Sequence, residues 1–106
     1  MEGNFFQDQS FIIGREGHIY IGDPSVSKYH AEISVSRQGI YLKDLDSTNG
    51  TYLVRNSQLI HFREGYVNIE QKVFIGSRQY SIKDLLDIVS IFNTDIEQPD
   101  SFTAAV

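Results

Sequence analysis

The chain of 106 residues contains no cysteine and no long apolar run. Without cysteine, disulfide bonds and thiolate metal ligands are excluded, and the composition is compatible with a reducing compartment. No apolar run approaches the roughly 20 residues that cross a bilayer, and the N-terminal residues lack a basic and apolar signal segment. We therefore expect a cytoplasmic protein that has no membrane partner.

Positive charge is also scarce: the chain has nine Lys and Arg residues and 14 Asp and Glu residues, so its net charge is −5. Binding to a nucleic-acid backbone needs a basic face, so we expect no nucleic-acid partner. A local anion site remains compatible with this charge, since a few cations can form a positive island on an acidic surface. Its candidates are Arg15, Lys28, Arg37 and Arg55; ordinary surface charge explains Arg37 and Arg55 equally well.

The length fits one domain with one core, and an apolar content of 41% favours a folded chain over disorder. Short apolar runs recur about every eight to twelve residues between turn residues, which is typical of an antiparallel β-sandwich or barrel. We expect strands at Ser10–Ile13, His18–Ile21, Tyr29–Val35, Gly39–Leu42, Thr51–Val54, Gln58–His61, Tyr66–Ile69, Lys72–Ile75 and Gln79–Ile82.

Turn residues divide these runs. Glu16-Gly17 predicts a tight hairpin between its two flanking strands, and Gly76-Ser77 predicts another hairpin tip. Asn49-Gly50 suits left-handed backbone angles. Asp23-Pro24-Ser25 begins a loop, because Pro24 lacks an amide donor and keeps the preceding residue extended.

The pattern changes after Ile82. Residues 83–92 carry Leu85, Leu86, Ile88, Val89 and Phe92 at roughly helical spacing, which predicts a short C-terminal helix packed on the sandwich. The β-branched residues in this stretch would also suit a strand. Residues 93–106 are polar and read as a tail or a linker.

The candidate residues for an anion site carry hydrogen-bond donors. The guanidinium of Arg15 can form two parallel bonds to an anion, and the hydroxyls of Ser27 and Thr48 can add two more. Lys28 can contribute a backbone amide, while the amide of Asn49 matches the paired C=O and N–H of a peptide backbone. Taken alone, the two hydroxyls would be ordinary turn or capping groups. Together they favour an anion site, formed where the loops of a sandwich gather at one end.

The sequence contains few residue patterns that are typical of catalytic or metal sites. His18, His30 and His61 have no metal-binding spacing. Asp44 and Asp46 alternate along an extended segment without forming an acid/base pair. Ser27 and His30 lack a third orienting acid and an oxyanion loop. We therefore expect no enzyme activity, no catalytic residue, no metal and no cofactor.

Three motifs carry the polar residues discussed above. They are Phe11-Ile12-Ile13-Gly14-Arg15, the segment from Asp23 to Ile33 with Ser27-Lys28-Tyr29-His30 at its centre, and the segment from Leu45 to Leu53 with Asp46-Ser47-Thr48-Asn49-Gly50-Thr51. Together they resemble the motifs of the forkhead-associated (FHA) domain family. They occur in the family's order over residues 11–82. The resemblance implies an all-β fold, an antiparallel β-sandwich of the FHA type, whose apical loops bind phosphothreonine peptides.

The resemblance also implies roles for single residues. Arg15, Ser27 and Thr48 would contact the phosphate, Lys28 would add its backbone amide and its charge, and Asn49 would hold the peptide main chain. Residues that would support this site are Gly14, His30 and Gly50. His30 has the opposite strand parity to Ala31 and Ile33, which puts it beneath the Ser27 loop.

The expected organisation is an N-terminal segment or short strand at 1–10, the FHA domain at 11–82, a C-terminal helix at 83–92 and a tail or linker at 93–106. FHA domains usually place about two strands ahead of the Gly-Arg pair, and residues 1–10 have room for one at most. A sheet edge would then be exposed and could pair with the C-terminal segment or another chain. The Gln71-Lys72 turn also departs from the family's usual Gly-Asp pair.

Two functions remain open on the sequence. The first is a phosphothreonine-dependent signalling module whose partner is a protein or peptide phosphorylated on threonine by a Ser/Thr kinase. The second is an assembly or dimerisation domain that self-associates through sheet faces or edges without phosphate.

Overall fold

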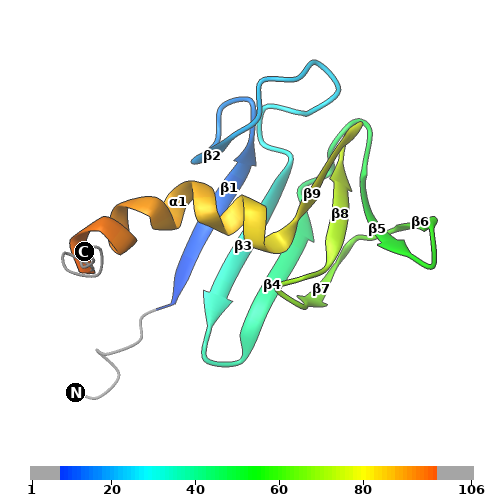
Figure 1. Cartoon of the computed structure of the whole chain (residues 1–106). Coiled ribbons are helices and arrows are strands. Elements are labelled where there is room, and N and C mark those ends of the chain that lie inside the picture. Colours follow the sequence, from blue (N-terminus) through cyan, green and yellow to red (C-terminus); the bar gives the residue numbers. More distant parts are fainter. Residues whose placement is uncertain (1–7, 98–106) are drawn as a thin grey trace.

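The computed structural model describes residues 8–97. Within these residues, nine strands precede one helix (Figure 1). In order, the elements are β1 (Gln9–Gly14), β2 (Ile19–Tyr20), β3 (Ala31–Ser36), β4 (Gly39–Asp44), β5 (Thr51–Arg55), β6 (Gln58–His61), β7 (Glu64–Val67), β8 (Lys72–Ile75), β9 (Arg78–Ser81) and α1 (Ile82–Glu97).

The strands form two sheets. One has the order β2-β1-β3-β4-β7 and the other has the order β6-β5-β8-β9. Alternation of side chains along each strand directs one row inward, and these rows meet in a shared core. Ile33 and Leu42 from the first sheet and Val73 and Ile75 from the second are completely buried.

The predicted β-sandwich is confirmed, and each of the nine predicted strands forms with ends that shift by no more than two residues. The alternation in β3 explains why this prediction works. Ala31 and Ile33 are buried while Glu32 and Ser34 are only partly covered, as expected of a strand with one face on the core.

The predicted hairpin at Glu16-Gly17 is wrong. Strands β1 and β2 pair in parallel, with Ile13 opposite Ile19. The chain leaving β1 instead follows the loop before β3, because the amide of Glu16 donates to the carbonyl oxygen of Lys28 over 3.0 Å. It then turns back through a bond of 3.2 Å from the amide of Gly17 to the carbonyl oxygen of Gly14. Bonds to a distant segment therefore decide the path of this loop.

The C-terminal helix is longer than predicted, and the strand alternative is wrong. Helix α1 begins at Ile82 and continues past Phe92 to Glu97. Its start is capped reciprocally, since the amide of Asp84 donates to the hydroxyl of Ser81 and the amide of Ser81 donates to the carboxylate of Asp84. No helix-breaking residue follows until Pro99, so the polar composition of residues 93–97 does not end the helix. The remaining predicted tail, residues 98–106, lies outside the described residues.

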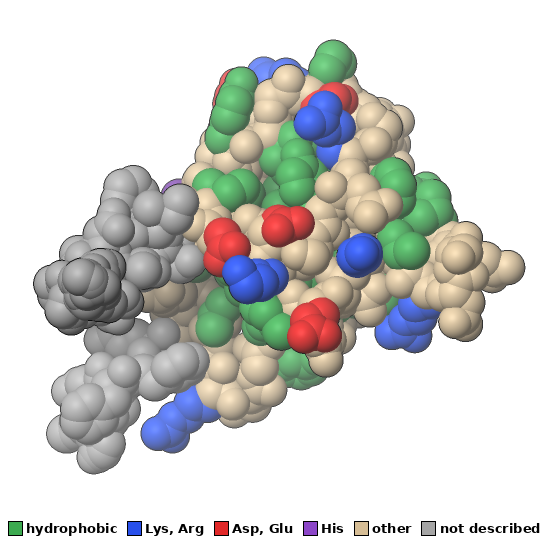
Figure 2. Space-filling model, in the orientation of Figure 1, with side chains coloured by type: hydrophobic (Ala, Val, Ile, Leu, Met, Phe, Trp, Pro, Cys, Tyr) green, Lys and Arg blue, Asp and Glu red, His purple; other side chains and the backbone are tan. Residues whose placement is uncertain are grey.

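Helix α1 contacts β9 and β2, and it places Ile82 and Leu85 in the core. On the face seen in Figure 2, acidic and basic side chains are intermixed rather than gathered into one field. Within residues 8–97, no helix is long and apolar enough to span a membrane.

Candidate functional site

Three loops meet at one end of the sandwich, at the top of Figure 1. They are the β1–β2 turn, the β2–β3 loop and the β4–β5 loop. The amide of Arg15 donates to the carbonyl oxygen of Ser27 over 3.1 Å, which joins the first two loops. Gly14 makes this approach possible, because a Cβ atom at that position would overlap the carbonyl oxygen of Lys28. The close packing of two backbones therefore requires glycine.

His30 joins the second loop to the third. Its side chain is completely buried. The Nδ1 atom accepts a hydrogen bond of 2.9 Å from the amide of Ser27. Because Nδ1 is an acceptor, Nε2 carries the proton and donates to the carbonyl oxygen of Gly50, also over 2.9 Å. Gly50 itself has a φ of 88°, in the left-handed region that favours glycine.

The loops enclose a surface pocket of about 320 Å³. The residues that line it are Arg15, Pro24, Ser25, Val26, Ser27, Lys28, Thr48 and Asn49. All five binding residues expected from the sequence are therefore brought together, although they come from three separate segments. None of the described lining residues is acidic, and Arg15 and Lys28 are the cations that line the pocket on a protein of net negative charge.

The donors of this pocket are held in place by the loops themselves. The Nε atom of Arg15 donates to the carbonyl oxygen of Val26 over 2.6 Å, which orients the guanidinium and leaves its two terminal amino groups as donors. The hydroxyl oxygen of Ser27 accepts a bond of 3.0 Å from the amide of Thr48, so its own proton can be given to a ligand. The arrangement is preorganised for an anion with several acceptor oxygens.

Asn49 was expected to hold the main chain of a peptide, and in the structure it also joins two loops. Its amide nitrogen donates to the carbonyl oxygen of Ser25 over 2.9 Å and so connects the third loop to the second. The side-chain carbonyl oxygen is left as an acceptor. It is one of the two side-chain groups, carbonyl and amino, that would bond a peptide backbone.

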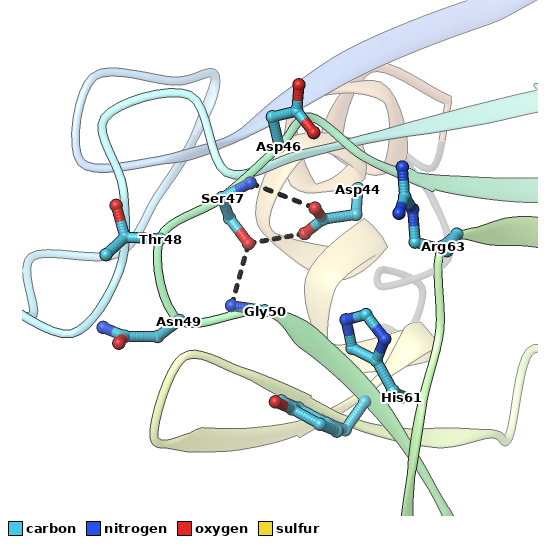
Figure 3. A pocket seen from close by; sticks show the side chains of 9 residues that line it. Asp44, Asp46, Ser47, Thr48, Asn49, Gly50, His61 and Arg63 are labelled. Carbon is cyan, nitrogen blue, oxygen red and sulfur yellow. Dashed lines mark hydrogen bonds between the residues drawn. The ribbon is translucent and has the colours of Figure 1, made fainter.

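The third loop is braced by residues that we did not predict as part of the site (Figure 3). The carboxylate of Asp44 accepts bonds from the amide and hydroxyl of Ser47, at 3.0 and 2.6 Å, and from the hydroxyl of Thr51 at 2.7 Å. The hydroxyl of Ser47 in turn accepts from the amide of Gly50. Ser47 therefore points toward Asp44, whereas Thr48 and Asn49 point the other way.

The spacing of Asp44 and Ser47 is a signal that was available in the sequence, because a carboxylate often accepts from groups a few residues later in a turn. Burial raises the pKa of Asp44, but hydrogen bonds from Ser47 and Thr51 outweigh that effect and lower the pKa below its ordinary value. The carboxylate therefore stays ionised and serves the loop.

A fourth loop also contacts the site. The amide of Ser77, in the β8–β9 turn, donates to the hydroxyl of Ser25 over 2.9 Å, and Arg78 lies 3.4 Å from the carboxylate of Asp23. Hydrogen bonds from the hydroxyl and the amide of Ser25 lower the pKa of Asp23. The sequence marked Gly76-Ser77 only as a hairpin tip, and no local pattern signals a contact between residues more than 50 positions apart.

A neighbouring pocket of about 280 Å³ opens on the other side of the third loop (Figure 3). Arg63 and His61 line it, but so do Asp44 and Asp46. Two carboxylates make this second pocket a poorer receptor for a dianion than the pocket at Arg15.

The geometry also bears on catalysis and on metals. Both ring nitrogens of His30 are engaged by the amide of Ser27 and the carbonyl of Gly50, so the imidazole is not placed as a base for the Ser27 hydroxyl. Among residues 8–97, no group of three or more His, Cys, Asp or Glu side chains could hold a metal ion.

The family model for the FHA domain matches residues 11–75. The chain therefore belongs to the forkhead-associated domain family. Among curated proteins, none matches the chain with significant similarity.

Solved FHA domains resemble the chain in structure as well. The FHA domain of FhaA, complexed with the intracellular domain of Rv3910, is 31% identical with a TM-score of 0.60, over 69% of this chain and 78% of that one. A structure from a study of phosphothreonine-dependent FHA domain interactions is 29% identical with a TM-score of 0.60, over 69% and 74%. The FHA domain of CT664 from Chlamydia trachomatis, 22% identical over 69% and 73%, shares the fold with a TM-score of 0.58.

Replacing Gly14 by alanine should disrupt the loop cluster. The new methyl group would meet the rigid backbone at Lys28, so we expect a loss of stability and displaced amide resonances around Ser27. The matched control is Gly22→Ala, whose methyl group would meet the exposed and movable end of Tyr20. Urea unfolding and two-dimensional NMR of both variants measure the effect. Equal stability of the two variants would contradict the requirement for glycine at position 14.

The brace at Asp44 predicts a pH dependence. Because its pKa is lower in the folded than in the unfolded chain, its stabilising contribution is present above the unfolded pKa of about 3.9 and is lost as pH falls through the folded value. Urea unfolding across the acidic range should show a shallower loss of stability for Asp44→Asn than for the wild type. The control is the exposed Asp46→Asn, which keeps a residue tolerant of left-handed angles. Identical pH profiles for the wild type and Asp44→Asn would exclude the brace.

Proposed function

We propose that this chain is a phosphothreonine-dependent protein-interaction module that docks on a protein or peptide phosphorylated by a Ser/Thr kinase. The observation that carries the proposal is the pocket at Arg15, where charged and hydroxyl donors from three loops converge without an acidic lining residue. Membership of the FHA family supports it. We place this activity in the cytoplasm, and we assign the domain a binding role rather than a catalytic one.

A phosphoryl group fits the chemistry of this pocket. It carries close to two negative charges near neutral pH and three acceptor oxygens. In our proposal the terminal amino groups of Arg15 bind two of these oxygens, and the hydroxyls of Ser27 and Thr48 donate to the phosphate from the other loops. Lys28 adds its backbone amide and its charge. Such charge-assisted bonds are the stronger class of protein hydrogen bonds.

The peptide main chain would lie across Asn49. Its free carbonyl oxygen accepts from a backbone amide of the partner, while its nitrogen keeps the loops joined through Ser25. In this scheme the phosphate provides most of the affinity, and the main-chain contact requires an extended peptide next to the phosphothreonine. Gly14, His30 and Gly50 support the site without touching the ligand.

Substitution of Arg15 tests this function directly. With a degenerate phosphothreonine peptide library as probe, Arg15→Ala should weaken binding about tenfold to a hundredfold, the equivalent of roughly 1.5–3 kcal/mol for bonds to a charged group. The control is Arg37→Ala, which removes the same charge in the β3–β4 turn at the opposite end of the sandwich. Equal binding of phosphorylated and unphosphorylated peptides by the wild type would overturn the proposal.

A second candidate function, self-association without phosphate, is favoured by one feature. Strand β6 is an edge of the four-stranded sheet among the described residues. It exposes 54% of Leu59 and 43% of Ile60. An apolar edge with free backbone groups is a template for pairing with a second copy. The role is compatible with the pocket, since no residue of β6 lines it.

Sedimentation over a concentration series tests self-association. If the edge pairs, the wild type should associate as concentration rises, and Leu59→Lys should weaken that association because a charge protects an edge strand. A wild type that stays monomeric at the highest concentration would remove the second candidate.

A further inference from the structure

Glu16 follows Arg15 in the chain and contacts Lys28, the other cation of the proposed phosphate pocket. Its carboxylate oxygen Oε2 is 3.9 Å from Nζ of Lys28. The other oxygen, Oε1, accepts a hydrogen bond of 3.1 Å from the hydroxyl of Tyr29. One carboxylate thus engages two successive residues of the loop before β3, of which Lys28 lines the pocket.

The backbone keeps these groups together. The amide of Glu16 donates to the carbonyl oxygen of Lys28, so the two side chains start from adjacent points on two loops. Their contact is nevertheless exchangeable, because the side chains are 58% exposed for Lys28 and 51% exposed for Glu16. Ion pairs of this exposure are weak and are screened by salt. A ligand anion that enters the pocket can therefore compete for Lys28.

We propose that Glu16 is an internal competitor for the phosphate site, which sets its affinity by holding the ammonium group of Lys28 until a ligand takes it over. This inference rests on the proposed function. In the empty site, the Glu16–Lys28 pair is electrically neutral and offers a ligand little net charge. Arg15 is not paired in this way, since its guanidinium bonds only a neutral carbonyl oxygen in the described contacts. Arg15 is then the permanent anchor, and Lys28 is the cation that changes partner.

Removal of the carboxylate should tighten binding. For Glu16→Gln we expect the affinity for a phosphothreonine peptide to rise about twofold to fivefold at low salt, the range of an exposed ion pair. The gain should shrink at high salt. Glu16→Asp keeps the carboxylate, so its affinity should lie closer to that of the wild type than the affinity of Glu16→Gln does.

A charge-matched control separates this local effect from the change in net charge. Glu70 precedes β8, and β8 leads to the Gly76-Ser77 turn beside the pocket, so Glu70 lies at the far end of the sandwich. Glu70→Gln should leave affinity almost unchanged. Equal gains for Glu16→Gln and Glu70→Gln would overturn the proposal.

A double-mutant cycle tests whether Lys28 transmits the effect. If Glu16 acts by competing for Lys28, the gain from Glu16→Gln should be largest with Lys28 present and should fall in the Lys28→Met background. Equal gains in both backgrounds would overturn competition for Lys28.

The contact itself has a signature that is independent of ligand. The hydrogen bond and the charge of Glu16 raise the pKa of the Tyr29 phenol. An NMR titration should therefore show the phenol of Tyr29 ionising at lower pH in Glu16→Gln than in the wild type. An unchanged titration would exclude the contact on which the inference depends.

Binding is measured by isothermal titration with the best phosphothreonine peptide selected from the library, at low and high salt. If the wild type selects no phosphothreonine peptide, the proposed function fails and this inference fails with it. If the wild type binds and Glu16→Gln binds with the same affinity, the inference fails alone.

Discussion

The site depends above all on the two hydrogen bonds of one buried imidazole. His30 accepts from the amide of Ser27 and donates to the carbonyl oxygen of Gly50, so it fixes the distance between the loop before β3 and the loop before β5. Loops at the end of a sandwich have few core contacts of their own, and a buried polar group must satisfy both nitrogens to be tolerated there. The result is a rigid base for a pocket that is otherwise made of exposed side chains.

Around this base, Arg15 and Ser27 are each oriented by a neighbour and keep donor capacity for a ligand. Arg15 donates from one nitrogen to a carbonyl oxygen, and the hydroxyl oxygen of Ser27 accepts from an amide. Two of the acids nearby are engaged by other groups, since Asp44 braces its own loop and Asp23 contacts Ser25 and Arg78. Glu16 differs from these two, because its carboxylate contacts Lys28 of the pocket. An acidic protein can in this way keep a local positive site, with a counter-charge at its edge.

The elements were largely predictable from sequence because their causes are local. Alternation in Ala31–Val35 and turn residues such as Asn49-Gly50 define strands and turns without tertiary information. The errors arose where distant groups decide the structure. The β1–β2 turn follows the backbone at Ser27 and Lys28, which no local pattern shows, and so the hairpin prediction failed. The end of α1 was misplaced because polar residues were read as a tail although nothing before Pro99 opposes a helix.

In the site, too, features with local causes were predictable and features that depend on distant residues were not. The expected binding residues line one pocket, since three motifs in order imply loops at one end of a sandwich. The bracing residues were missed for different reasons. Asp44 and Ser47 are close in sequence, and their spacing was a usable signal. Ser25 and Ser77 meet only in the folded chain. The competing contact of Glu16 with Lys28 depends on the same loop path that was mispredicted.

The proposed function depends on phosphate binding at the Arg15 pocket. The most direct measurement is an NMR titration of the ¹⁵N-labelled chain with a phosphothreonine peptide and with its unphosphorylated form. We expect large, saturable shifts with the phosphorylated peptide alone, for the amides of Ser27, Lys28, Thr48 and Asn49. Equal shifts with both peptides, or shifts confined to residues of β6, would contradict it.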